Sequence, residues 1–176
     1  MAEKLRTIIV EDEELARNLM KSFLSENDKI ELVAECENGF EGVKMINELK
    51  PDLVFLDIQM PKITGFEMLE LLDHKPQIVF ATAYDQFAIK AFEHNAADYL
   101  LKPYSKERLN EAISKVTERI QKDGAASDVA EKILNFPREG FIDRVVVKDR
   151  HKIHIIPVDN IRYIESMDDY VMIYTN

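Results

Sequence analysis

The sequence contains a single cysteine, Cys36, so an internal disulfide framework is excluded. It also lacks any apolar run long enough to span a membrane, and its first residues, MAEKLRTIIVEDEE, contain no apolar segment followed by a cleavage site. Positive charge is scarce, because 23 Lys and Arg face 33 Asp and Glu, for a net charge of −10. This balance argues against a chain that binds polyanions along its whole surface, although it leaves room for a local basic face. These absences predict a soluble cytoplasmic protein without membrane contact.

The rest of the composition is typical of a folded protein. Hydrophobic residues make up 46% of the 176 residues, which is enough for a packed core and too many for a disordered chain. We find no internal repeat and no low-complexity tract. A chain of this length accommodates one domain of ordinary size and part of a second.

Up to about residue 122, the chain alternates between short apolar runs and amphipathic segments. The apolar runs cover 7–10, 53–57, 78–81 and 99–101, and residues 30–37 alternate between polar and apolar as a strand would. The amphipathic segments cover 13–25, 39–50, 65–73, 85–94 and 105–122. Strands that alternate with helices predict a parallel sheet covered by helices on both faces. Five such pairs fit a flavodoxin-like (βα)5 doubly wound α/β fold, in which ligands bind at the carboxyl ends of the strands.

Several helical segments carry apolar residues at helical spacing. These residues are Leu15, Leu19 and Phe23 in the first helix and Leu109, Ile113, Val116 and Ile120 in the last. We expect the four residues of the last helix to face the core. Ser105 precedes that helix and is a favourable N-cap residue.

The pattern changes after the last helix. Residues 123–128, DGAASD, are small and polar, and they predict either a linker or a continuation of the helix. Further on, the segments RVVVKD, KIHIIPV, IRYIE and YVMIYT predict the start of an all-β unit. We therefore predict a first domain over 1–122, a linker over 123–137 and part of a second domain over 138–176. A unit as small as this last one rarely buries enough surface to fold alone.

Five polar residues follow or end the predicted strands. Glu11 and Asp12 follow the first strand, Asp57 ends the third, Thr82 follows the fourth and Lys102 follows the fifth. Because the carboxyl ends of parallel strands meet at one edge, we expect these side chains to gather there. Three carboxylates repel one another, and a hard divalent cation such as Mg²⁺, which prefers oxygen ligands, would relieve that repulsion. The lysine and the hydroxyl then suit an anion forming on Asp57, with phosphate as the obvious candidate.

The chemistry that fits this set is phosphoryl transfer. A carboxylate can act as a nucleophile and become an aspartyl phosphate, and catalysis then consists mostly of positioning and charge neutralisation. Each residue alone has an ordinary explanation, since an acidic pair after a strand is often a loop feature and a lone Thr or Lys at a strand end is usually solvated. It is the occurrence of all five at strand ends that favours a site.

The segments IIVEDE, LVFLDIQMPKITGFEML, FATAYDQ and DYLLKP resemble the receiver domain of two-component response regulators, in order and spacing, over about residues 4–122. The resemblance implies that Asp57 accepts a phosphoryl group from a sensor histidine kinase. It also implies that Mg²⁺ is held by Glu11, Asp12, Asp57 and the backbone carbonyl of Gln59. A receiver catalyses its own phosphorylation and dephosphorylation, so the resemblance does not imply a metabolic enzyme.

The same resemblance assigns the remaining residues of the set. It implies that Thr82 and Lys102 contact the phosphoryl oxygens and that the bond between Lys102 and Pro103 is cis, which an X–Pro bond permits. Tyr99 matches the switch aromatic of the family, which turns inward when Thr82 moves toward the phosphate. Without the other motifs, Tyr99 would be read as a half-buried aromatic residue of the sheet.

The tail resembles the opening of a LytTR-type DNA-binding domain, as found in LytR/AlgR regulators, through the phrase IPVDNIRYIESMDDYVMIYT. Such domains are considerably longer, so the resemblance implies a truncated piece of a longer regulator that binds DNA through its full-length C-terminal domain. Residues 138–176 themselves contain six Lys and Arg against seven Asp and Glu, and they therefore show no basic footprint for phosphates.

Two functions compete on this reading. The first is a transcription regulator that dimerises on phosphorylation through the face formed by the fourth helix, the fifth strand and the last helix. Candidate charged residues of that face are Lys90, Glu93, Asp98, Arg108 and Arg119. The second is a phosphorylation-controlled signalling module that acts through protein contacts, without DNA binding in this chain, with the β-rich tail pairing through its exposed edge.

Two further classes fit the residues less well. A phosphatase of the haloacid dehalogenase type also uses an Asp nucleophile at a strand end, but it needs a second Asp two residues later, where this chain has Gln59. A flavin-binding flavodoxin would place phosphate at the first turn, and residues 11–14 of that turn are all acidic.

Overall fold

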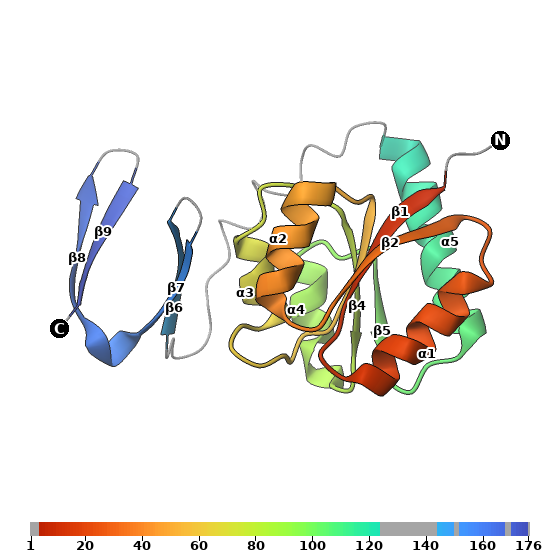
Figure 1. Cartoon of the computed structure of the whole chain (residues 1–176), viewed down its shortest axis with the longest axis horizontal. Helices are drawn as coiled ribbons and strands as arrows, with labels where there is room; N and C mark the ends of the chain where they lie inside the picture. Colours follow the sequence, from red (N-terminus) through yellow and green to blue (C-terminus); the bar gives the residue numbers. More distant parts are fainter. Residues whose placement is uncertain (1–3, 124–143, 150–151, 168–169, 176) are drawn as a thin grey trace. The chain divides into compact units, whose positions relative to one another are not determined.

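The computed structural model describes residues 4–123, 144–149, 152–167 and 170–175, and the chain divides into two compact units, Met1–Phe136 and Pro137–Asn176. The first unit contains the parallel sheet and its helices (Figure 1). Its elements are β1 (Leu5–Val10), α1 (Glu14–Ser25), β2 (Ile30–Cys36), α2 (Gly39–Leu49), β3 (Leu53–Leu56), α3 (Gly65–Glu70), β4 (Gln77–Thr82), the 3₁₀ turn η1 (Asp85–Phe87), α4 (Ala88–Glu93), β5 (Asp98–Leu101) and α5 (Lys106–Asp123).

The five strands form one sheet in the order β2-β1-β3-β4-β5, and every neighbouring pair is parallel. This is the flavodoxin-like order, so the predicted doubly wound α/β fold is confirmed. The strand β3 lies at the centre of the sheet, and all four of its residues are buried. Its continuous apolar run is therefore the sequence signature of a strand covered on both faces.

Helices cover both faces of this sheet (Figure 1), with α1 and α5 on one side and α2, α3 and α4 on the other. The core on the α1 and α5 side joins residues from all five strands to the two helices. Its buried members are Ile9, Met20, Leu24, Ile30, Leu53, Phe55, Val79, Ala81, Leu100, Leu109, Ala112, Ile113 and Val116. This burial holds the carboxyl ends of β1, β3, β4 and β5 in fixed positions relative to one another.

The buried faces of α1 and α5 differ in part from the apolar spacing. In α1, Leu15 and Leu19 are 78% and 47% exposed, because the row formed by Arg17, Met20 and Leu24 faces the sheet instead. In α5 the expectation for Ile120 was wrong, since this residue is 36% exposed. An 18-residue helix spans roughly 27 Å and a six-residue strand roughly 20 Å, so the last turn of the helix extends past the sheet.

Two helices end differently from the pattern. The helix predicted over 65–73 stops at Glu70, where the next amide bonds three residues back, from Leu71 N to the Met68 carbonyl at 3.0 Å. The side chain of Asn47 then accepts the N–H of Asp73 at 2.9 Å, and this bond draws the chain away from the helix. The segment predicted as one helix over 85–94 is split into the 3₁₀ turn η1 and the short helix α4.

The start of α5 agrees with the prediction. The hydroxyl of Ser105 accepts the N–H of Arg108 at 3.2 Å, as expected of an N-cap.

The described residues of the second unit form β-strands and one 3₁₀ turn, in agreement with the predicted all-β unit. Its elements are β6 (Arg144–Asp149), β7 (Lys152–Pro157), the 3₁₀ turn η2 (Val158–Asn160), β8 (Ile161–Met167) and β9 (Tyr170–Thr175). They form two antiparallel hairpins, β6 with β7 and β8 with β9. In the second hairpin the rings of Tyr163 and Tyr174 stack at 4.3 Å, while Tyr163 and Ile164 are more than half exposed.

The predicted linker lies outside the described residues, apart from Asp123, which ends α5. The predicted limits of the domains stay a prediction. Among the described residues, no helix is both long and apolar enough to cross a membrane.

Candidate functional site

The sheet brings three carboxylates to one edge. Glu11 follows β1 and Asp57 follows β3, and these strands are adjacent, with Asp57 N bonded to the Val10 carbonyl at 2.9 Å. The N–H of Glu11 donates to the carbonyl of the buried Cys36 at 3.0 Å, which ties the same edge to β2. One oxygen from each of Glu11, Asp12 and Asp57 lies within 4.8 Å of the others. The side chains of Glu11 and Asp57 are buried, whereas that of Asp12 is exposed.

Lys102 supplies the opposite charge. Its Nζ lies 2.6 Å from Oε2 of Glu11 and 3.0 Å from Oδ2 of Asp57, so one ammonium group bridges two buried carboxylates. Its position follows from the sheet, because the backbone N–H of Lys102 donates to the Thr82 carbonyl at 2.8 Å. The bond between Lys102 and Pro103 is cis. Buried charges are costly unless they are paired, and this bridge provides the pairing.

The electrostatics of the site follow from this crowding. Burial raises the pKa of Glu11 to about 7, and the charge of Asp57 adds to the rise while the hydrogen bond from Lys102 opposes it. Burial alone would lower the pKa of Lys102, but its hydrogen bond to Glu11 and the charge of Asp57 outweigh this effect and raise it. The ammonium group is therefore charged at neutral pH and is held by the two carboxylates.

The carboxylates fit a hard divalent cation. Mg²⁺ takes oxygen ligands and keeps several of its waters, so it needs only a few carboxylates on an open side of the protein. Glu11, Asp12 and Asp57 provide such a set, and the pocket beside them is open to solvent. That pocket is lined by Asp12, Glu13, Asp57, Gln59, Ala83, Tyr84 and Lys102. Gln59 is among these residues, and its N–H donates to Oδ1 of Asp57 at 3.3 Å.

Thr82 and Tyr99 lie on the two strands that follow Asp57 in the sheet. Thr82 ends β4 with a fully buried side chain, and its Oγ1 has no hydrogen-bond partner among the described residues. An unpaired buried hydroxyl costs about 1–3 kcal/mol, so such a group is unusual unless a ligand or a second conformation pairs with it. The hydroxyl of Tyr99, on β5, donates to the Tyr84 carbonyl. Burial, with the charges of Asp85 and Asp57, raises the pKa of Tyr99.

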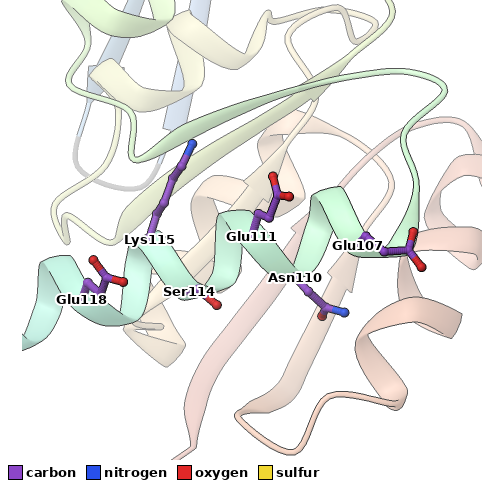
Figure 2. A pocket seen from close by; sticks show the side chains of 6 residues that line it. All are labelled: Glu107, Asn110, Glu111, Ser114, Lys115 and Glu118. Carbon is purple, nitrogen blue, oxygen red and sulfur yellow. The ribbon is translucent and has the colours of Figure 1, made fainter.

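A second and larger hollow lies away from this edge. Its lining residues, shown in Figure 2, are Glu107, Asn110, Glu111, Ser114, Lys115 and Glu118. All of them belong to α5, so the hollow is the solvent side of one helix and not a cleft between elements. The ammonium group of Lys115 also pairs with Asp98 at 3.1 Å. We do not assign a function to this hollow.

The structure shows which further residues shape the site. A Cβ on Gly65 would lie 2.4 Å from the carbonyl oxygen of Asp57, so α3 can begin this close to Asp57 only with glycine at this position. Thr64 and Glu67 form a full capping box at the same helix start, and the spacing T-x-x-E in the sequence could have predicted it. Arg17 was missed, and its burial had no signal in the sequence, since it stands between exposed and apolar positions of α1.

The comparisons with known proteins agree with this geometry. Residues 7–114 match the family model described as the response regulator receiver domain. The chain is 46% identical over 135 residues to the transcriptional regulatory protein BtsR of Escherichia coli (strain K12), which covers 75% of this chain and 56% of that protein. It is 40% identical over 164 residues to an uncharacterized response regulatory protein of Vibrio cholerae, covering 92% of this chain and 65% of that protein.

Among solved structures, the chain is similar to the response regulatory domain of protein mrkE from Klebsiella pneumoniae. The two share 35% sequence identity and superpose with a TM-score of 0.61, over 67% of this chain and 99% of that domain. The chain spans between 56% and 65% of the length of the two curated relatives named above.

Proposed function

Because this chain belongs to the response regulator receiver domain family and resembles transcriptional regulatory proteins, we propose that it accepts a phosphoryl group on Asp57 and thereby controls transcription. One observation carries the proposal. The ammonium group of Lys102 bridges Asp57 and Glu11, at 3.0 Å and 2.6 Å, beside an open pocket. This arrangement leaves one carboxylate both held in place and accessible to a phosphodonor.

The transfer step begins with the phosphohistidine of a sensor histidine kinase. An oxygen of the Asp57 carboxylate forms a bond to phosphorus while the P–N bond to the imidazole breaks. The imidazole nitrogen keeps the electron pair and takes up a proton. Lys102 stays charged and can hold a phosphoryl oxygen where it now holds Asp57, which favours the charge that spreads over these oxygens in the transition state.

The residues proposed to hold Mg²⁺ are Glu11, Asp12, Asp57 and, through its backbone carbonyl, Gln59. When bound, the cation would neutralise charge on the phosphoryl oxygens. The mutual distance of 4.8 Å or less among the three carboxylate oxygens supports this assignment. Glu11 must lose its proton to serve as a ligand, because metal ligands bind in their deprotonated form.

The switch is proposed to run through Thr82 and Tyr99. The buried Thr82 hydroxyl lacks a partner among the described residues, and a phosphoryl oxygen on Asp57 would give it one. Phosphorylation adds roughly −1.5 to −2 charges and would shift an existing equilibrium between two arrangements of the face formed by α4, β5 and α5. That face is proposed to form a homodimer.

Three charged residues of that face, Asp98, Arg108 and Arg119, are already engaged within the chain. Arg108 forms two hydrogen bonds with Asp98, at 2.7 Å and 2.9 Å, and a third with the Tyr99 carbonyl at 3.0 Å. Arg119 donates to the Asn95 carbonyl at 3.1 Å. A dimer that uses Asp98 or Arg108 would therefore have to add to these contacts or replace them.

DNA binding is proposed for a longer C-terminal domain of the LytTR type, of which residues 138–176 form the start. The all-β unit and the identity to transcriptional regulatory proteins support this part of the proposal. A signalling module without DNA binding in this chain is the second candidate. It is favoured by the charge balance of residues 138–176, where six Lys and Arg face seven Asp and Glu.

The test combines intact mass with light scattering. Wild type and Asp57→Asn are incubated with acetyl phosphate, with and without Mg²⁺. We expect wild type alone to gain one phosphoryl group, only with Mg²⁺, and to become a dimer. Gain of the group without dimerisation would support the acceptor and reject the proposed switch. No gain in wild type would reject phosphorylation at this site.

A further inference from the structure

Arg17 is a buried cation next to the proposed metal site, and the proposed chemistry gives it no role. It lies in the second turn of α1, and its side chain is 9% exposed. Its Nη1 donates to the backbone carbonyl of Glu11 at 2.7 Å, and its Nη2 lies 3.1 Å from the carboxylate of Glu37. Arginine is rarely buried unless it is paired, so these two contacts account for its position.

The contact with the Glu11 carbonyl completes the restraint of that residue. The N–H of Glu11 donates to the Cys36 carbonyl at 3.0 Å, so the backbone of Glu11 is held on both sides. The backbone N–H of Arg17 also donates to the Glu13 carbonyl at 3.0 Å. The turn from Glu11 to Glu13, which carries two of the three carboxylates, is thus fixed to α1 at two points.

We infer that Arg17 is a positioning residue for the divalent cation, an inference that rests on the proposed function. Three carboxylate oxygens within 4.8 Å repel one another and push the turn outward. The guanidinium of Arg17 opposes this movement by holding the Glu11 carbonyl. Without it, the ligands relax apart, and the cation binds a site that it must first reassemble.

The chain offers a matched control at the opposite end of β1. The Nη1 of Arg6 donates to the Leu49 carbonyl, also at 2.7 Å, and this contact is part-buried. Arg6 stands at the amino end of the strand and Glu11 follows its carboxyl end. Arg6→Met therefore removes the same kind of contact without touching the site.

The test is a Mg²⁺ titration followed by backbone amide NMR, together with the rate of phosphorylation by acetyl phosphate at several Mg²⁺ concentrations. For Arg17→Met we expect roughly tenfold weaker Mg²⁺ binding, in line with the effect of removing groups that orient metal ligands. Its phosphorylation rate should fall at low Mg²⁺ and return to that of wild type at saturating Mg²⁺. Arg6→Met should lower the melting temperature and leave the Mg²⁺ midpoint unchanged.

Two milder variants keep the test decisive if Arg17→Met does not fold. Arg17→Lys retains the cation but replaces the planar guanidinium by a single ammonium group on a flexible stem, which holds the Glu11 carbonyl less rigidly, so we expect a shift between wild type and Arg17→Met. Glu37→Gln removes the ion pair and keeps the bond to Glu11, and its Mg²⁺ midpoint should stay close to wild type, because Glu37 is 72% exposed.

The possible failures are distinguishable. If wild type neither binds Mg²⁺ nor becomes phosphorylated, the proposed function fails and the inference falls with it. If wild type does both and Arg17→Met or Arg17→Lys binds Mg²⁺ as wild type does, the inference alone is overturned. An equal shift of the Mg²⁺ midpoint in Arg6→Met would also overturn it. So would a phosphorylation rate of Arg17→Met that saturating Mg²⁺ does not restore.

Discussion

The two ends of the parallel sheet treat their polar groups differently. At the amino end, the buried hydroxyl of Thr7 donates to the Leu5 carbonyl at 2.9 Å. The guanidinium of Arg6 donates to the Leu49 carbonyl at the end of α2 at 2.7 Å, and the backbone N–H of Arg6 donates to the carboxylate of Asp52 at 2.8 Å. At the carboxyl end, two buried carboxylates share the ammonium group of Lys102. There the buried hydroxyl of Thr82 has no partner among the described residues.

The difference indicates at which end of the sheet a bound ligand would stabilise the folded protein. A buried donor without a partner costs about 1–3 kcal/mol, and crowded carboxylates add repulsion. The same fold satisfies such groups at the amino end of β1, so the sheet itself does not impose the cost. The carboxyl end is instead the place where a cation and a phosphoryl group can supply the missing contacts.

The largest effect on the carboxyl end of the sheet is expected for Lys102→Met. Removing the shared ammonium group should lower the rate of phosphorylation by acetyl phosphate roughly 10²- to 10³-fold, because one charge donor to the transition state is lost. The rate is measured by intact mass over time. Lys106→Met is the control, since Lys106 pairs with Glu26 on the surface and should leave the rate unchanged. A rate for Lys102→Met within a factor of three of wild type would contradict the proposed role.

A smaller effect is expected at Gly65. In Gly65→Ala the new Cβ meets the backbone oxygen of Asp57 at 2.4 Å. Because a backbone atom cannot move away by changing a rotamer, the free energy of unfolding should fall by about 2 kcal/mol. In Gly39→Ala the new Cβ meets the side chain of Ile63 at 2.5 Å, which can change its rotamer, so the loss should stay below about 1 kcal/mol. Urea denaturation followed by circular dichroism measures both. Equal losses would show that the approach to Asp57 is no tighter than that to Ile63.

The two buried threonines sharpen the comparison directly. Both side chains are 0% exposed, but of the two hydroxyls only that of Thr7 has a hydrogen-bond partner in the described part of the chain. Thr7→Val should therefore cost about 1 kcal/mol of unfolding free energy. Thr82→Val replaces an unpaired hydroxyl by a methyl group of the same shape, so it should be neutral or stabilising. If both substitutions cost the same, the Thr82 hydroxyl has a partner in solution.

A further effect is a pH dependence. Burial raises the pKa of Glu11 to about 7, above its ordinary value of 4.5, so the fold favours the protonated form. In the metal-free protein, the stability that Glu11 contributes is complete below about pH 4.5 and is lost as the pH rises through about 7. Mg²⁺ requires the ionised form, so its affinity should be roughly tenfold weaker at pH 6 than at pH 8. Melting temperatures with and without Mg²⁺ at both pH values measure this difference, and Glu11→Gln should abolish it.

Much of this architecture could be predicted from the sequence, because it depends on local patterns. The apolar runs gave the five strands, and the order of strands and helices gave the parallel sheet. Since parallel strands end at one edge, the convergence of Glu11, Asp57 and Lys102 followed without any distance. The roles assigned to these residues stay predictions until phosphorylation is measured.

What could not be predicted depends on contacts between distant segments. The end of α3 is set by Asn47 on another helix, and no periodicity reports such a bond. The burial of Arg17 and the exposure of Leu15 and Leu19 depend on the rotation of α1 against the sheet. Two adjacent rows of the helix were both plausible from spacing, and only packing decides between them.

The burial of Cys36 has a practical consequence for labelling the protein. Cys36 is fully buried, and burial raises the pKa of its thiol to about 12, so its thiolate is scarce and shielded at neutral pH. A cysteine introduced at an exposed position such as Leu15 would then be the thiol that reacts with a maleimide or a spin label. Because the chain also contains no tryptophan, an introduced tryptophan would provide an intrinsic fluorescence signal of its own. Distances between chosen positions could thus be followed during phosphorylation without first removing native residues.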